Sequence, residues 1–210
     1  LTPALLAANA SSRALTLEAI PSPVSQQNVT CDAIVSMLAR LHRFAPDRNW
    51  HYHTHRWPDA QLELSLHLLA LPEAAARALR RCQRDSDRLF AEAGLISGDS
   101  NAGNWGQREN GEFVLFDWER FSTGHPAIDL APLIKGMGTP EEYRHLAARY
   151  CRFNPRSEND LARDIALAKA WIVSEVITLL HKRQKADFPR FQHWYRSYLP
   201  DWLKQIETVI

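Results

Sequence analysis

Small oxygen-bearing side chains and glycines are concentrated in one short part of this chain. Residues 95–107 read LISGDSNAGNWGQ, and five of the chain's eight glycines lie in this stretch or within four residues of it. The stretch contains Asp99 and Asn104, and Asp117 follows shortly after. Carboxylate and amide oxygens are ligands of hard cations such as Mg²⁺. A carboxylate held beside such a metal can accept the proton of an attacking hydroxyl while the metal neutralises phosphate charge, which is the chemistry of phosphoryl transfer.

A hairpin is predicted to bring these groups together. The dipeptide Asn-Gly at residues 110–111 is a strong hairpin signal, because both central positions of a type I′ turn need positive φ. A two-residue turn centred there pairs residues whose numbers sum to 221, which places Asn104 beside Asp117. The glycines of the preceding loop allow it to bend back and bring Asp99 to the same place. The alternative is a polar turn region whose Asp and Asn side chains merely cap turns.

The elements around this corner are predicted to be mainly helical. Apolar residues recur at helical spacing, and Thr139 with Glu142 forms a capping-box pattern before one of the helices. A short strand is expected over residues 14–20, and the last, aromatic-rich helical region is expected to be interrupted near Pro200. The fold class is therefore mainly α with a small β-hairpin, an α+β arrangement. The expected helices span residues 32–44, 61–69, 72–90, 139–153 and a long stretch from 158.

Composition excludes several classes of partner. The formal net charge is +1, so there is no basic excess that would point to nucleic acid. No apolar run reaches the length of a membrane span, so no membrane partner is expected. The cysteines Cys31, Cys82 and Cys151 are odd in number and far apart, which favours reduced thiols and a cytoplasmic location.

Four motifs resemble a known family. SGDSNAGN (97–104), LFDWE (115–119) and GHPAIDLA (124–131) are similar to the C-terminal lobe of the aminoglycoside phosphotransferase and choline kinase family, and LARLHRF (38–44) is similar to a helix end common in it. The resemblance covers roughly residues 14–135. It implies a protein-kinase-like fold and the phosphorylation of small-molecule hydroxyls with ATP and Mg²⁺.

The resemblance also implies a role for each matching residue. Asp99 corresponds to the catalytic aspartate, Asn104 and Asp117 to the magnesium ligands, and Asp129 to a structural aspartate that braces the catalytic loop. Ser97 stands where the family usually has histidine, a departure that affects the geometry of the loop rather than the proton acceptor.

The front of the chain departs further from the family. Such kinases hold ATP with a glycine-rich loop and a strand lysine in an N-terminal lobe. Here no glycine precedes Gly94, and the first lysine is Lys135. We therefore expect residues 1–24 to be the last strands of that lobe and the hinge, and residues 25–210 to be the helical catalytic and substrate lobe. With most of the N-terminal lobe absent, this chain alone is expected to be inactive.

Three further residues are candidates for substrate contact. Glu119 is a possible metal or substrate ligand, although a lone carboxylate is more often solvated or paired with arginine. Trp171 has a ring face that suits a cationic substrate. Glu175 lies in an apolar stretch and would need a partner when buried, for which an amine-bearing substrate is one candidate. The acceptor itself stays open among an aminoglycoside, a choline-like amine, a thiamine-like cation and a simple amino alcohol.

The histidines and two other functions complete the alternatives. His51, His53 and His55 alternate like metal ligands on a strand, but their neighbours favour an exposed loop. His125 is expected to make a structural hydrogen bond rather than to line a pocket.

A non-catalytic, pseudokinase-like binding module is the second hypothesis for the whole chain. A metal-dependent hydrolase is the third and is disfavoured because the sequence shows no second metal cluster.

Overall fold

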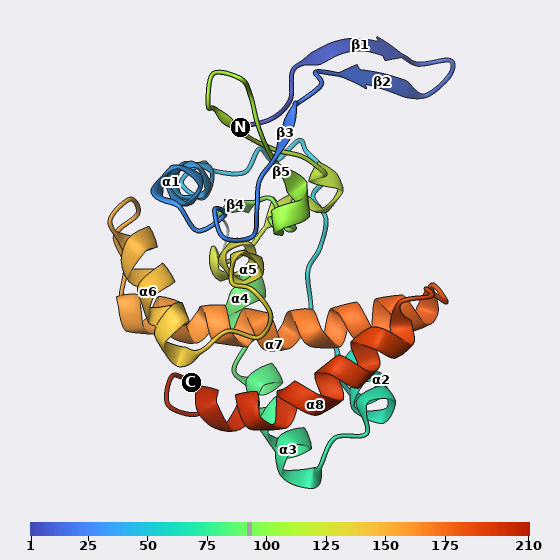
Figure 1. Ribbon diagram of the computed structural model, residues 1–210, viewed down its shortest axis with the longest axis vertical. Helices are drawn as coiled ribbons and strands as arrows, with labels where there is room; N and C mark the ends of the chain where they lie inside the picture. The colour runs from blue at the N-terminus through green and yellow to red at the C-terminus, as the bar shows by residue number, and fades with distance from the viewer. Residues whose placement is uncertain (92–93) are drawn as a thin grey trace.

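A long central helix organises the molecule. The computed structural model describes residues 1–91 and 94–210. Helix α7 (Glu158–Lys182) crosses the middle of the fold, and α2, α3, α5, α6 and α8 all contact it (Figure 1). Its small and aliphatic residues are buried on several sides, as expected of a helix surrounded by others. The remaining α-helices are α1 (Asp32–Leu41), α2 (Asp59–Leu69), α3 (Glu73–Arg84), α4 (Asp87–Ala91), α5 (Ala127–Leu130), α6 (Pro140–Cys151) and α8 (Phe188–Ile206).

The helix predictions are largely confirmed. Thr139 caps α6: its hydroxyl accepts the N–H of Glu142 at 3.2 Å, and the Glu142 carboxylate accepts the N–H of Thr139 at 2.8 Å. The helix expected over residues 72–90 is two helices, because the chain turns between α3 and α4. The interruption expected near Pro200 was wrong, since α8 continues through it. One lost N–H is tolerated there because residues on either side are buried against neighbouring helices.

The strands form three small sheets rather than one hairpin. Strands β1 (Leu5–Asn9) and β2 (Ala14–Leu17) form an exposed ribbon that projects from one end of the molecule (Figure 1). Strand β3 (Ser22–Pro23) pairs with β5 (Trp105–Gln107), which pairs with β6 (Phe113–Leu115). Strand β4 (Leu95–Ile96) pairs with β7 (Ser122–Thr123). The strand expected over residues 14–20 is shorter, and no residue bounds were predicted for β1. Three short 3₁₀ helices are described: η1 (Ala102–Asn104), η2 (Trp118–Arg120) and η3 (Ala131–Leu133).

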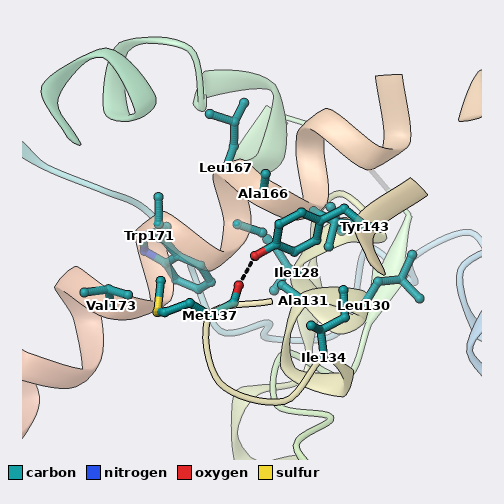
Figure 2. Close-up of a cluster of buried hydrophobic side chains, with 14 of the residues drawn as sticks. Ile128, Leu130, Ala131, Ile134, Met137, Tyr143, Ala166, Leu167, Trp171 and Val173 are labelled. Atoms are coloured by element: carbon teal, nitrogen blue, oxygen red, sulfur yellow. Dashed lines mark hydrogen bonds between the residues drawn. The ribbon is translucent and has the colours of Figure 1, made fainter. Parts of the chain in front are cut away.

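The core packs the segment α5–η3 against α7, beside α6. Figure 2 shows Ile128 and Ala131 of this segment beside Tyr143 of α6 and Trp171 of α7. The Tyr143 hydroxyl donates to the backbone oxygen of Met137, the dashed line in Figure 2, which secures the loop that leads into α6. Because these side chains are almost fully buried, α5 is a rigid platform. Within the described residues, no helix is both long enough and apolar enough to cross a membrane.

Candidate active site

Hydrogen bonds to a buried carboxylate hold the loop after β4 in place. Asp129 on α5 has no solvent exposure, and its carboxylate accepts three hydrogen bonds from the loop. The donors are the N–H of Ser97 at 2.7 Å, the N–H of Gly98 at 2.8 Å and the hydroxyl of Ser97 at 2.9 Å. The hydroxyl of Ser100 donates to the backbone oxygen of Asp129. Hydrogen bonds to a charged acceptor are among the stronger ones in proteins, so the loop is held firmly against α5.

A histidine that sequence reasoning did not assign joins this anchor to α1. His42 lies just after α1, within the motif at residues 38–44, and is buried. Its Nε2 is 3.1 Å from a carboxylate oxygen of Asp129, and its Nδ1 is 2.8 Å from the hydroxyl of Tyr150. The same hydroxyl accepts a hydrogen bond from the Asn154 side chain at 2.8 Å. The motif similarity singled out this segment, but the contact spans 87 residues and only the fold reveals it.

Gly98 is a glycine for two separate reasons. Its φ is +79°, in the left-handed region that other residues rarely adopt. A Cβ placed on it would lie 2.2 Å from the backbone oxygen of Arg120 and 2.7 Å from Nε2 of His55. The backbone immediately before Asp99 is therefore in direct contact with both of these groups.

Asp99 and Asn104 are linked within the same loop. The Asn101 amide donates to a carboxylate oxygen of Asp99 at 2.7 Å, and the Asn101 oxygen accepts the N–H of Gly103 at 2.8 Å. The Asn104 amide nitrogen donates to the backbone oxygen of Asp99 at 2.9 Å. Since its nitrogen is engaged, the oxygen of the Asn104 side chain is the atom available to a metal ion.

The register of the β5–β6 hairpin differs from the prediction by one residue. Trp105 pairs with Leu115, so paired residue numbers sum to 220 rather than 221. The turn contains three residues: the backbone oxygen of Arg108 accepts the N–H of Gly111 at 3.0 Å, and Gly111 has a φ of +86°. This is a type I turn followed by a left-handed glycine, the usual three-residue alternative to a type I′ turn.

Asp117 consequently lies one position beyond the predicted pair. The backbone of Asn104 is opposite Phe116, whose N–H donates to the Asn104 oxygen at 2.8 Å. Asp117 follows with φ 54° and ψ 64°, and its side chain is exposed. A left-handed Asp is uncommon, and strained residues of this kind cluster at functional sites. Asn104 and Asp117 thus lie at the open end of one hairpin, although they are not cross-strand partners.

This donor set fits a magnesium ion. An amide oxygen from Asn104 and an exposed carboxylate from Asp117 match the few protein ligands that Mg²⁺ takes, because the ion keeps several waters or phosphate oxygens. Asp99, whose backbone oxygen accepts the Asn104 amide, adds a half-buried carboxylate in the same loop.

The alternating histidines do not form a metal site. His51 and His53 are exposed, whereas His55 is only 5% exposed and packs against the loop. In the parts of the chain that the structure describes, no group of three or more His, Cys, Asp or Glu side chains is arranged to hold a metal ion. Burial, followed by the charge of Arg120, lowers the pKa of His55 to about 4, so the imidazole is neutral near pH 7.

His125 has a structural place, as expected. It is buried, its Nδ1 accepts the N–H of Ala127 at 3.2 Å, and its Nε2 is 3.3 Å from a carboxylate oxygen of Asp164. Burial lowers the pKa of His125 to about 3.

The structure changes two of the three substrate-contact expectations. Trp171 is 1% exposed and donates its indole N–H to the backbone oxygen of Arg56 at 3.2 Å, so its ring faces the core. Glu175 already has a partner, because Nη2 of Arg120 lies 2.8 and 2.7 Å from its two carboxylate oxygens. The amine-bearing ligand suggested for Glu175 is therefore not needed to satisfy it. Glu119 is exposed and remains a candidate.

Comparisons with known proteins agree with the motifs. The chain resembles a choline kinase, LicA, from Streptococcus pneumoniae, with a TM-score of 0.69 and 18% identity over 97% of this chain and 75% of that one. It also resembles an ethanolamine kinase of Plasmodium vivax, with a TM-score of 0.63 and 14% identity over 97% of this chain and 69% of that one. A third similar structure is that of the gentamicin-APH(2")-IIa complex, with a TM-score of 0.60 and 16% identity over 97% of this chain and 74% of that one.

At these identities the three structures establish the fold, which is kinase-like as predicted. A search of curated protein sequences finds no match. The profile of the phosphotransferase enzyme family matches residues 15–163, more than half of the sequence. The chain therefore belongs to the phosphotransferase enzyme family.

Proposed function

We propose that this chain is an ATP-dependent phosphotransferase that acts on a hydroxyl of a small molecule. One observation carries the proposal. The loop that contains Asp99 and Asn104 is hydrogen-bonded to buried Asp129, and the Asn104 amide donates to the backbone oxygen of Asp99. Asp117 lies at the same end of the hairpin as this loop. Family membership supports the reaction class. The neighbours named for choline, ethanolamine and gentamicin support a small alcohol or amino alcohol as the acceptor.

Each residue then has a defined task. Asp99 orients the acceptor hydroxyl and takes its proton, helped by the Asn101 amide that fixes one of its oxygens. Asn104 and Asp117 would hold Mg²⁺, which would supply neutralisation of phosphate charge during transfer. Asp129 keeps the loop in place through Ser97 and Gly98, so that Asp99 does not have to be ordered at the moment of reaction.

Substitution of Asp99 tests the proposal. The full-length protein and its Asp99→Ala variant are incubated with Mg-ATP and a panel of small alcohols, and ADP release and product mass are measured. We expect kcat to fall about 10²- to 10⁴-fold in the variant while calorimetry gives an unchanged affinity for Mg-ATP. Asp201→Ala, an exposed change on α8, is the control and should retain the wild-type rate. A normal rate in Asp99→Ala would exclude Asp99 as the proton acceptor.

A non-catalytic binding module is the second candidate, and one observation favours it. Residues 1–93 contain no glycine and the first lysine is Lys135, so this stretch holds no glycine-rich loop or strand lysine of the kind with which such kinases bind ATP. Calorimetry on this chain discriminates between the two functions. Mg-ATP binding with turnover supports the phosphotransferase, whereas retained ligand binding with no transfer to any acceptor in the panel supports the binding module.

A further inference from the structure

A polar cluster lies directly behind the loop that carries Asp99. His55 comes from the segment before α2, Arg120 ends η2, and Glu175 belongs to α7. His55 is 5% exposed, and the side chains of Arg120 and Glu175 are 20% and 24% exposed. Three distant parts of the chain therefore place ionisable side chains at one point beside the proposed active site.

The ion pair in this cluster ties the segment after Asp117 to the central helix. Nη2 of Arg120 binds both carboxylate oxygens of Glu175, at 2.8 and 2.7 Å. The guanidinium carbon is 6.0 Å from the ring of Trp171, which lies one helical turn before Glu175. A partly buried pair is screened less by water than a surface pair, and removing one member leaves the other charge uncompensated.

The same arginine touches the catalytic loop through its backbone. The Arg120 oxygen and the His55 imidazole both press against Gly98, where even a single added carbon would overlap them. His55 Nδ1 is 3.4 Å from Nη2 of Arg120, and its ring meets Trp171 edge to face at 5.3 Å. Because this contact leaves no free space, a displacement of Arg120 moves the residue next to Asp99.

The cluster is not optimised for stability alone. Among the residues that the structure describes, Arg120 Nε is buried without a hydrogen-bond partner. A buried donor without a partner destabilises the fold. A fold that keeps this cost beside a catalytic loop favours a positional role for the residue concerned.

We propose that Arg120 and Glu175 are positioning residues that fix the positions of Asp99 and Asp117 relative to α7. His55, packed against Gly98, keeps the distance between the ion pair and the loop constant. Arg120 follows Asp117 by three residues and contacts Gly98, so one ion pair controls the placement of both groups. None of the three is required to touch the reacting atoms. The catalytic part of this inference rests on the proposed phosphotransferase function, whereas the control of loop order does not.

Hydrogen exchange together with kinetics tests the inference. The variants are Glu175→Gln and Arg120→Lys, which weaken the pair with little change in size. The control is Glu63→Gln, which alters another two-contact pair, with Arg80, on the exposed surface between α2 and α3. In the two test variants we expect exchange of the Ser97 and Gly98 amides to rise about tenfold, whereas α2 amides are unchanged. We also expect kcat to fall about tenfold or more while the acceptor KM changes less than twofold. The control should match wild type in loop exchange, α2 exchange, kcat and KM.

The outcomes separate this inference from the proposed function. Loop exchange that stays at the wild-type level in both test variants overturns the inference, whatever the rates. An equal rise in amide exchange in the loop and in α2 also overturns the inference, because the substitution has then lowered the stability of the whole fold. Faster loop exchange with an unchanged kcat in an active enzyme refutes the catalytic role. If the loop responds but the full-length wild-type protein transfers no phosphate to any acceptor in the panel, positional control is supported and the proposed function is refuted.

Discussion

Asp129 and Ser97 are joined by two hydrogen bonds although 32 residues separate them in the sequence. One links the Ser97 N–H to the Asp129 carboxylate, and the other links the Ser97 hydroxyl to the same group. Serine at this position thus adds a second donor to the anchor. The departure from the family's usual histidine does not detach the loop from α5, because Gly98 also donates to this carboxylate.

Removing the anchor is expected to destabilise the fold. Asp129→Ala leaves the N–H groups of Ser97 and Gly98 without their buried acceptor, and His42 loses one of its two partners. Since each buried unsatisfied donor costs about 1 to 3 kcal/mol, the free energy of unfolding should fall by roughly 3 kcal/mol or more. Urea denaturation measures this, with Asp201→Ala as the exposed control. A fall no larger than that of the control would show that the anchor contributes little.

Two left-handed glycines provide a matched pair. Gly98 and Gly111 have φ values of +79° and +86°, so alanine costs about 1 to 2 kcal/mol of backbone strain at either position. Only at position 98 would the new Cβ lie 2.2 Å from a backbone oxygen, whereas at position 111 its nearest neighbour is 4.0 Å away. Gly98→Ala should therefore lower the free energy of unfolding clearly more than Gly111→Ala in parallel urea titrations. Equal losses would contradict the close contact with Arg120.

Asp117→Asn removes the carboxylate charge of residue 117 without changing its backbone conformation. Asparagine tolerates left-handed φ nearly as well as aspartate, so the variant should keep the wild-type melting temperature. Losing the carboxylate should weaken binding of Mn²⁺, used as a spectroscopic substitute for Mg²⁺, by at least about tenfold in an electron paramagnetic resonance titration. Glu112→Gln, on the same hairpin but paired with Arg108, is the control and should bind Mn²⁺ like wild type. Equal affinities in wild type and Asp117→Asn would exclude Asp117 as a ligand.

The stability of the protein should depend on His55 below pH 6.5. The pKa of His55 is about 4 in the fold against 6.5 for an ordinary histidine, so on acidification the unfolded chain takes up this proton first. Neutral His55 makes its full contribution to the free energy of unfolding above pH 6.5. As the pH falls from 6.5 towards 4, this contribution decreases by about 1.4 kcal/mol per pH unit. His55→Gln lacks this loss. Its unfolding free energy, measured by urea titration from pH 7.5 to 4.5, should fall less steeply than that of wild type, and parallel curves would refute the shifted pKa.

Local patterns identified much of the fold. The cap of α6 needs only Thr139 and Glu142, which contact each other within one turn, so the sequence was sufficient to place it. The Asn-Gly dipeptide located the β5–β6 hairpin for the same reason. It did not decide the register, because a two-residue and a three-residue turn suit the same glycine equally well. In the structure, Asn110 lacks the positive φ that a type I′ turn requires, and Trp105 pairs with Leu115, so the turn has three residues.

The sequence by itself determined which residues make up the proposed site, because Asp99, Asn104 and Asp117 lie within a single short loop and hairpin. Only the tertiary structure decided what holds them. The contacts of Asp129 with Ser97 and of Glu175 with Arg120 join residues 32 and 55 positions apart. Such contacts depend on how α5 and α7 pack in the core, and hydrophobic burial, which drives that packing, is non-directional and does not encode individual side-chain partners. For this reason Glu175, predicted from its apolar surroundings to need a partner, found that partner within the fold.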